Sequence, residues 1–571
     1  MTTTAQTPSS TDGADKPRII PIFVALMVAM LLSSLDQTIL GTALPTIVGE
    51  LDGVQHMLWV ATAYILGATV VMPIYGKLGD LFGRKTIFLV ALSIFVAGSI
   101  VGGFASNMET LIAGRAIQGV GGGGLMILSQ AIIADVVPPR DRGKYGGFIG
   151  AVFAFSSVVG PLLGGLFTDS LTWRWAFWIN IPLGIAAIAA AAVFIRLPKH
   201  TNRAKPKIDY LGTALIAIAT TGLVLVTSWG GTEYDWDSLV IIALIAITIV
   251  GAALFVWVET KAVEPIIPLS LFKDRNFTIT TVAGLLVGVA MFGAIGYMPT
   301  FLQIANGINA TESGLLLLPM LVGLLITAIG SGLLMSKTGR YKWMPITGAA
   351  LIGVALVLFS TLTATTSPFV TGVYLFVLGA GLGLTIQVLV LIVQNSVPHK
   401  VLGTATAANA FFREIGATVG SAVVGSVFAT RLTQQLAATF GNSENAAANS
   451  LTPAAINALP TELHDLISTA YADALTPIYL FLVPVMVIAF VLLFFIKEVP
   501  LASTVPVLEG MEDEGSDVAG SDVAGSDVAG SDVAGPDVAD DTASAPAVVT
   551  ASDTASDSDP GSDDTEPART L

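Results

Sequence analysis

Cysteine is absent from the 571 residues, which excludes disulfide bonds and thiol chemistry. Charged residues make up only 12% of the chain, about half the share of a soluble globular protein, which excludes an ordinary water-facing surface. The motifs Gly-x4-Gly-Lys-Ser/Thr, Gly-x-Ser-x-Gly and His-Glu-x-x-His do not occur, and the four histidines are scattered. The sequence therefore predicts no ATPase, no enzyme, no metal site and no cofactor.

Long apolar runs take the place of the missing charge. Apolar residues make up 53% of the chain, and they recur in runs long enough to cross a hydrocarbon core of about 30 Å as a helix. We expect an all-α polytopic membrane protein with fourteen transmembrane helices. The predicted spans are 19–43, 58–78, 86–105, 111–136, 143–168, 175–196, 210–229, 239–259, 278–298, 313–335, 343–363, 368–395, 403–430 and 475–496.

The net charge of −15 belongs to a C-terminal tail, because seventeen acidic residues and one base follow position 508. This tail repeats Ser-Asp-Val-Ala-Gly from Ser516 to Gly535, a composition too poor in apolar residues to fold. We expect disorder here, in either a dispensable solvating segment or a partner-binding one. The other 508 residues are near neutral and give no indication of nucleic-acid binding.

Basic residues are distributed unevenly between the predicted loops. Loops on one side carry groups such as Arg140, Arg142 and Lys144, whereas loops on the other side hold only Arg174 and Arg431. Because basic loops stay in the cytoplasm, this asymmetry places both termini there. We expect a multi-pass protein of the inner (cytoplasmic) membrane.

Three glycine-containing blocks of the first half recur in the second half at a nearly constant offset, for example Gly143 at Gly403 and Gly76 at Gly332. Two six-span halves are therefore duplicated, with spans 7 and 8 inserted between them, which is typical of a transporter that rocks about a central site. The expected domains are a cytoplasmic N-terminus (1–18), an N-terminal bundle (19–196), the inserted helices (197–276), a C-terminal bundle (277–497) with an extracytoplasmic loop (431–474), and the tail (498–571).

The block from Gly76 to Lys85 lies in the predicted loop between spans 2 and 3. Its glycines allow two helix ends to approach closely, and Asp80 can accept from a helix N-terminus or pair with Arg84. We expect a latch that holds one conformation; the alternative is a basic loop that only fixes topology. In the second half, Ser336 stands at the Asp80 position. The latch residues are Gly76, Gly79, Asp80, Gly83 and Arg84.

In the first half, Asp36 stands well inside span 1 and Arg115 inside span 4. A charge in this position is costly unless it is paired, hydrated or neutralised, so it indicates function. Arg115 stays charged and needs a partner, for which Asp36 is the best candidate. We expect Asp36 to gain and lose a proton during a transport cycle; the alternative for both residues is a structural ion pair.

Span 5 combines a proline, which kinks a helix, with small residues that form a smooth packing face. The alternative is a generic glycine-rich packing face. The residues of this block are Gly147, Ser156, Gly160, Pro161, Gly164 and Gly165.

Arg413 and Glu414 lie inside span 13. Adjacent residues point about 100° apart on a helix, so the two charges need not pair with each other. Glu414 is a candidate for binding a cationic substrate or a second proton, and equally for acting as the counter-ion of Arg413.

Over residues 19–497 these blocks resemble, in content and order, the fourteen-span drug:proton antiporter family of the major facilitator superfamily. The Gly76–Lys85 block resembles the superfamily's loop motif, and the segment around Arg115 resembles its span-4 arginine motif. The span-1 segment around Asp36 and the span-5 block resemble signatures of the antiporters. Gly41 stands where the family commonly has Asn, and Ser156 replaces a glycine.

The resemblance implies a proton-coupled efflux antiporter that exports lipophilic small molecules, such as drugs, antibiotics and cations, with Arg115 in proton transfer. Its partners would be the substrate, protons and the lipid bilayer, without ATP or nucleic acid, in a protein that functions as a monomer. The nearer alternative is export of a lipid or a self-made secondary metabolite. The distant alternative is a membrane sensor that transports nothing.

Overall fold

A computed structural model of the chain describes residues 19–503 apart from 196, 198–206, 232, 309, 441–455 and 457–459. The polar N-terminus (1–18) and the tail from 504 lie outside the described residues, so the disorder expected for the tail stays a prediction. Within the described residues the fold is helical, and the bridge between Gly230 and Tyr234 is isolated.

Thirteen helices of the described residues are long and apolar enough to cross a membrane, and a shorter apolar helix, α14, makes fourteen. Each predicted span coincides with one of them, which confirms the predicted fold class. The helices are α1 (Ile19–Glu50), α2 (Met57–Phe82), α3 (Arg84–Gly103), α4 (Met108–Val136), α5 (Pro139–Ser170), α6 with α7 (Trp175–Trp178 and Asn180–Phe194), α8 (Tyr210–Trp229), α9 (Leu239–Glu259), α10 with α11 (Arg275–Ile295 and Met298–Ala305), α12 with α13 (Ala310–Leu315 and Leu318–Thr338), α14 (Trp343–Phe359), α15 (Pro368–Ser396), α16 (Leu402–Phe440) and α19 (Thr461–Phe494).

We call the end of the bundle where α2 meets α3 the inner end, and the opposite end the outer end. The Gly76–Lys85 block is not a loop, because α2 continues to Phe82 and α3 begins at Arg84. Gly83 alone separates them, at a φ of 93° that favours glycine. At the outer end, α16 and α19 extend into the segment 431–474 that the sequence predicts as a loop.

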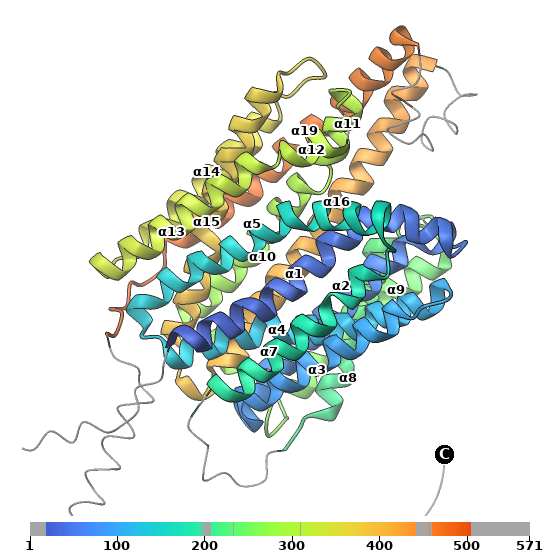
Figure 1. Cartoon of the computed structure of the whole chain (residues 1–571). Coiled ribbons are helices and arrows are strands. Elements are labelled where there is room, and N and C mark those ends of the chain that lie inside the picture. Colours follow the sequence, from blue (N-terminus) through green and yellow to red (C-terminus); the bar gives the residue numbers. More distant parts are fainter. Residues whose placement is uncertain are drawn as a thin grey trace, which may run out of the picture. The chain divides into compact units, whose positions relative to one another are not determined.

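The two halves repeat one packing pattern (Figure 1). In the first half, α4 packs between α2 and α3, and α5 packs on α1; in the second, α15 packs between α13 and α14, and α16 packs on α10. Repeated glycines make this possible, since a side chain at Gly119 would collide with the backbone of Tyr64, and one at Gly379 with the backbone of Met320. Small residues at such contacts let helices approach closely in lipid, where burial of apolar surface gives little drive.

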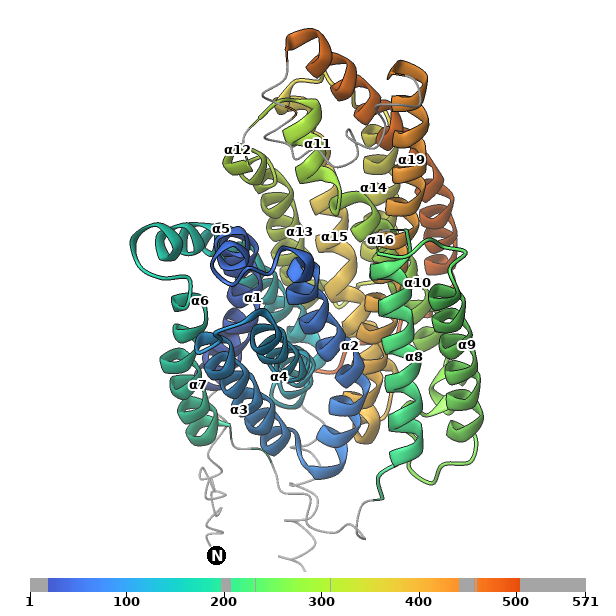
Figure 2. The same cartoon turned by 90° about the vertical axis from the view of Figure 1, so that its right-hand side faces the viewer.

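The halves meet at two interfaces near the inner end, α2 with α16 and α5 with α13. Gly76 of α2 abuts Gly403 of α16, and Gly332 of α13 abuts Gly143 of α5. Because these glycines are counterparts in the sequence repeat, the two interfaces are equivalent places in the duplicated fold. The inserted helix α8 lies beside α2 and α16, with α9 on its far side (Figure 2).

The residues that follow α19 cross the inner end. The Tyr341 hydroxyl donates to the Val499 carbonyl at 3.0 Å, and the Arg140 backbone N–H donates to the Ala502 carbonyl at 3.1 Å. Burial raises the pKa of Tyr341, so its phenol stays neutral here. Because Arg140 lies in the first turn of the first-half helix α5 and Tyr341 precedes the second-half helix α14, this segment links the two halves.

Candidate functional site

The two charges predicted inside the spans meet in the first half. Asp36 lies within α1 and is completely buried, and Arg115 of α4 is 3% exposed. The Arg115 Nη1 donates to Asp36 Oδ2, and its Nε donates to the Val60 carbonyl of α2 at 3.3 Å. The guanidinium also lies over the ring of Tyr64, 4.3 Å from its centroid. Arg115 thus connects three helices: an ion pair joins α4 to α1, and a hydrogen bond and a cation–π contact join α4 to α2.

Two amides missed by the sequence analysis complete this network. Gln118 Nε2 of α4 and Asn180 Nδ2 of α7 each donate to Asp36 Oδ1 at 2.8 Å. Both amides also donate to the Ser99 hydroxyl of α3, at 2.8 and 3.3 Å. Every partner that the structure gives the Asp36 carboxylate is a donor, which fits its ionised form. The sequence did contain one signal for such a partner, which is an amide side chain inside an otherwise apolar span, as at Asn180.

A small cavity adjoins the network on the side of Tyr64. Its volume is about 70 Å³, and its lining residues all belong to α1, α2, α4 and α5 of the first half. Ser33 and Gln37 line it, and the Ser33 hydroxyl shares a hydrogen bond of 2.8 Å with the Tyr64 hydroxyl. This volume suits water rather than a drug-sized molecule, whose sites usually exceed about 300 Å³.

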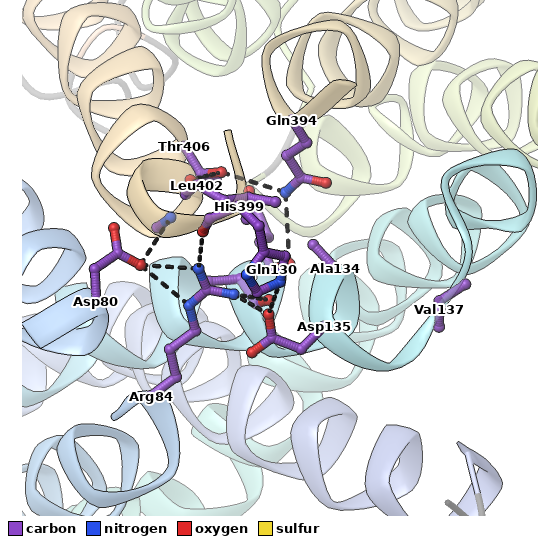
Figure 3. A network of polar contacts seen from close by, with 12 residues as sticks. Asp80, Arg84, Gln130, Ala134, Asp135, Val137, Gln394, His399, Leu402 and Thr406 are labelled. Atoms are coloured by element: carbon purple, nitrogen blue, oxygen red, sulfur yellow. Dashed lines mark hydrogen bonds and ion pairs between the residues drawn. The ribbon is translucent and has the colours of Figure 1, made fainter. Parts of the chain in front are cut away.

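The predicted latch forms a second polar network at the inner end (Figure 3). Arg84, 6% exposed, donates from Nη2 and Nε to Asp80 Oδ1 at 2.8 and 3.3 Å. Its Nη1 contacts Asp135 of α4 and donates to the Ala131 carbonyl at 3.2 Å. The Arg84 Nη2 also donates to the His399 carbonyl of the second half at 3.4 Å. Asp135 and His399 were not selected from the sequence, because nothing in their local patterns indicates a shared partner.

Asp80 joins the two halves directly. Its carboxylate accepts the backbone N–H groups of Gly403 at 3.1 Å and Thr404 at 2.7 Å, and the Thr404 hydroxyl at 2.9 Å. These N–H groups belong to the first turn of α16, where a negative charge is favoured. The structure therefore shows both interactions considered for Asp80, and they connect α2 with α16 at the inner end. The role of a latch stays a prediction.

The equivalent α5/α13 interface uses other groups. The Ser336 hydroxyl of α13 donates to Asp141 Oδ1 of α5 at 2.6 Å. Arg140 donates to the carbonyls of Ser336 and Lys337 at 2.8 and 3.0 Å. The carboxylate that the repeat lacks at Ser336 is thus present on the facing helix.

The glycine block of α5 packs on two different helices rather than on one smooth neighbour. Gly147 faces Ile329 of α13, whereas Gly160 and Gly164 face α1, where Gly160 abuts Thr38. A side chain at Gly147 would approach the Ile329 Cα to 2.9 Å. This block therefore connects the helix that carries Asp36 with the α5/α13 interface.

The remaining residues of the block fit the same packing. Ser156 is fully buried, and its carbonyl accepts from the Thr38 hydroxyl at 3.0 Å. Its own hydroxyl donates to the Val152 carbonyl of the same helix at 2.9 Å. Pro161 lies inside α5, and Gly165 has open space at its Cβ position.

Arg413 and Glu414 lie on α16, away from the Asp36 network. The Arg413 residue is 9% exposed and its backbone packs against Gly288 of α10. Among the described residues, no ion pair joins the Arg413 and Glu414 side chains. Their role stays a prediction. Across all the residues that the structure describes, no group of three His, Cys, Asp or Glu side chains could hold a metal ion.

Comparisons with known proteins agree with this architecture. The family model described as Major Facilitator Superfamily matches residues 26–421. An uncharacterized MFS-type transporter of Mycobacterium tuberculosis is 45% identical over 480 residues, which cover 84% of this chain and 70% of the relative. The multidrug transporter protein MdtP of Bacillus subtilis is 39% identical over 422 residues, covering 74% and 77%. The solved structure of the proton:xylose symporter XylE has a similar fold, with a TM-score of 0.56 and 14% identity, covering 86% and 98%.

Proposed function

The chain belongs to the major facilitator superfamily, and on that premise we propose that this multi-pass membrane transporter exports lipophilic small molecules in exchange for protons. The observation that carries the proposal is the buried ion pair of Asp36 and Arg115. Ionisable residues inside membrane spans are costly, so their presence indicates a function. Similarity to a protein named as a multidrug transporter supports drugs as substrates.

Proton exchange at Asp36 would act on the contacts of α1. In this conformation the inner end is closed and the carboxylate accepts from donors on α4 and α7. A proton arriving from the outer end removes the charge that holds Arg115 and occupies one acceptor site. Because Thr38 on the same helix bonds α5, the loosened α1 can transmit the change to the α5/α13 interface. The halves then rock, the proton leaves at the inner end, and substrate enters there.

The membrane potential is large enough to drive this cycle when one net charge enters per turnover, as when a neutral molecule leaves in exchange for one proton. Exchange of one proton for a monovalent cation moves no net charge and is driven by the pH gradient. A potential of 100 mV supplies about 2.3 kcal/mol for each elementary charge moved, which corresponds to a substrate gradient of roughly fiftyfold. We place the inner end and both termini in the cytoplasm, because the basic loops lie on that side, and we place the protein in the cytoplasmic membrane as a functional monomer.

Replacing Asp36→Asn tests the proposal, because the amide keeps the volume but cannot exchange a proton. Efflux of ethidium, a lipophilic cation, is measured in proteoliposomes with an imposed pH gradient, with and without a protonophore. We expect loss of the protonophore-sensitive flux with normal insertion of the protein. Asp52→Asn, at an exposed carboxylate after α1, is the matched control and should transport like the parent.

Undiminished gradient-driven flux in the Asp36→Asn variant would overturn the proposal. A fluorescent phospholipid is assayed beside ethidium. Flux that depends on Asp36 for the phospholipid but not for ethidium would favour lipid export.

A further inference from the structure

The inserted hairpin of α8 and α9 lies over one of the two equivalent interfaces. Near its inner end, Ile216 of α8 belongs to the same apolar cluster as Ala405 and Ala408 of α16. Near its outer end, the Trp229 ring packs edge-on against Trp59 of α2, with centroids 5.4 Å apart. Helix α8 therefore crosses from α16 to α2 and covers the line along which these helices meet.

The loop that follows α9 strengthens this cover at the inner end. Glu264 pairs with Lys77 of α2 at 2.6 Å, and the Lys77 side chain is 7% exposed. Two residues further on, Ile266 is 2% exposed and joins the α16 cluster that contains Ala405. The Ile266 N–H donates to Glu259 Oε1 at 3.0 Å, which holds the loop against the end of α9. One short segment thus contacts both sides of the α2/α16 interface.

Helix α9 adds a second layer outside α8. It packs on α8, and only 11% of its most apolar stretch of residues is buried within the protein. Large apolar side chains such as Ile249 and Trp257 are more than half exposed. These surfaces suit contact with lipid tails, so the hairpin separates the α2/α16 interface from the bilayer.

Within the described helices, the α5/α13 interface has no comparable cover. Of the described helices, α15 alone packs closely on both α5 and α13, and it lies on the interior side, where Gln387 and Gly146 line a cavity of about 30 Å³ between the halves. On the other side, Phe148 of α5 is 45% exposed, and Ile326 of α13 is 59% exposed.

The uncovered contact is lined by glycines on the α5 side. Gly143, Gly147 and Gly150 of α5 face α13, whereas Gly160 and Gly164 face α1. The glycines of α5 that face α13 therefore all lie in the half of α5 nearer the inner end. Because glycines line this contact, few side chains have to be displaced when the helices separate.

We propose that substrate partitioned into the inner leaflet enters the central path laterally, between α5 and α13, while the inserted hairpin closes the equivalent route between α2 and α16. This inference rests on the proposed function, since it names the entry route and restricts the substrates to molecules that dissolve in the bilayer. It also gives the inserted hairpin a role, which is to leave one lateral opening instead of two.

The absence of cysteine allows a direct test with matched single-cysteine variants. Gly146→Cys lies behind the α5/α13 interface, and Thr406→Cys lies at the counterpart position behind the α2/α16 interface. Both residues are buried, the nearest neighbour of a Gly146 Cβ is an ordinary 3.4 Å away, and cysteine nearly matches threonine in size. Gly330→Cys, an exposed position of α13 with open space, is the reference for reaction within the bilayer.

Each variant is reconstituted, cycled under a pH gradient, and treated with a long-chain alkyl maleimide confined to the bilayer or with a charged maleimide inside the aqueous compartment at the inner end. We expect the charged reagent to label both buried cysteines, and the alkyl reagent to label Gly146→Cys at least fivefold faster than Thr406→Cys. Equal rates, a reversed preference, or labelling by the charged reagent alone would overturn the lateral route and leave the proposed function standing. Failure of both reagents at both positions would show that the inner end does not open, which overturns the proposed function with it.

Discussion

The α2/α16 and α5/α13 interfaces occupy equivalent places in the two halves, but they carry their carboxylates on opposite partners. In the first, Asp80 projects from α2 to the N-terminus of α16. In the second, Ser336 stands at the Asp80 position and donates to Asp141, which belongs to the first turn of α5. A duplicated fold can therefore keep the backbone contact while the charge moves from one helix to the facing one.

The basic residues of the two interfaces differ in the same way. Arg84 is buried and contacts two carboxylates, whereas its repeat counterpart Arg340 is exposed. Removing one member of a buried charge pair costs more than removing an exposed charge, because the buried partner is left without a counter-ion. We therefore expect the α2/α16 interface to hold most of the polar stabilisation of the closed inner end, and the uncovered α5/α13 interface to separate more easily.

The largest expected effect comes from Arg84→Gln. The change leaves the carboxylates of Asp80 and Asp135 buried without their cation, which costs about 3–5 kcal/mol. We expect the free energy of unfolding to fall by that amount in urea or thermal denaturation of the purified protein, or the protein to fail to accumulate. Arg340→Gln is the matched control at the equivalent position, and we expect a change within about 0.5 kcal/mol.

Comparable losses in the two variants would contradict the unequal division of stabilisation between the interfaces. To separate folding from transport, the free energy of unfolding and the labelling of the inner end are also measured for Arg84→Lys. It keeps the charge but not the fork of donors, so stability should recover in part while the closed inner end remains weakened.

A smaller effect is expected from Ser336→Asp, which gives the α5/α13 interface the carboxylate of the other one. The new charge would face Asp141 across a contact that is now a hydrogen bond of 2.6 Å. Losing this bond and adding repulsion should cost about 1–3 kcal/mol, or roughly 5- to 150-fold in the population of the closed inner end. Faster labelling of Gly146→Cys by the charged maleimide measures the shift.

Combining Ser336→Asp with Asp141→Ser tests whether the carboxylate can be moved from α5 to α13 without opening the α5/α13 interface. The pair recreates the Asp80 arrangement, with a carboxylate on α13 facing the N-terminus of α5. Labelling should return toward the parent rate, and a double variant as fast as Ser336→Asp alone would show that the position of the charge does not matter.

Much of this architecture could be predicted from the sequence, because membrane spans, basic loops and repeated glycines are local signals. The fourteen helices, the duplication that relates Gly76 to Gly332, and the choice of Asp36 as the contact of Arg115 all follow from such patterns. The orientation in the membrane stays a prediction, as do the roles of Asp36 and Arg115.

Partners supplied by packing between distant helices could not be predicted. Asn180 reaches Asp36 only because α7 packs on α1, and Asp141 compensates for Ser336 only because α5 meets α13. The sequence also marks α8 and α9 as an insertion without indicating which interface they cover. That placement depends on contacts such as Trp59 with Trp229, which lie far apart in the chain.

The smallest expected effect comes from Glu264→Gln, which weakens the tie between the hairpin loop and α2. Glu264 is 37% exposed, so its pair with Lys77 should be worth no more than about 1 kcal/mol. We expect labelling of Thr406→Cys by the alkyl maleimide to rise less than fivefold, with ethidium efflux unchanged. Exchanging the charges through Lys77→Glu and Glu264→Lys should restore the parent rate, and Lys261→Gln, an exposed residue of the same loop, should leave it unaltered. If Glu264→Gln instead raised labelling of Thr406→Cys to the rate of Gly146→Cys, this single ion pair would account for the difference between the two interfaces, and the apolar contacts of α8 would not be what closes the α2/α16 route.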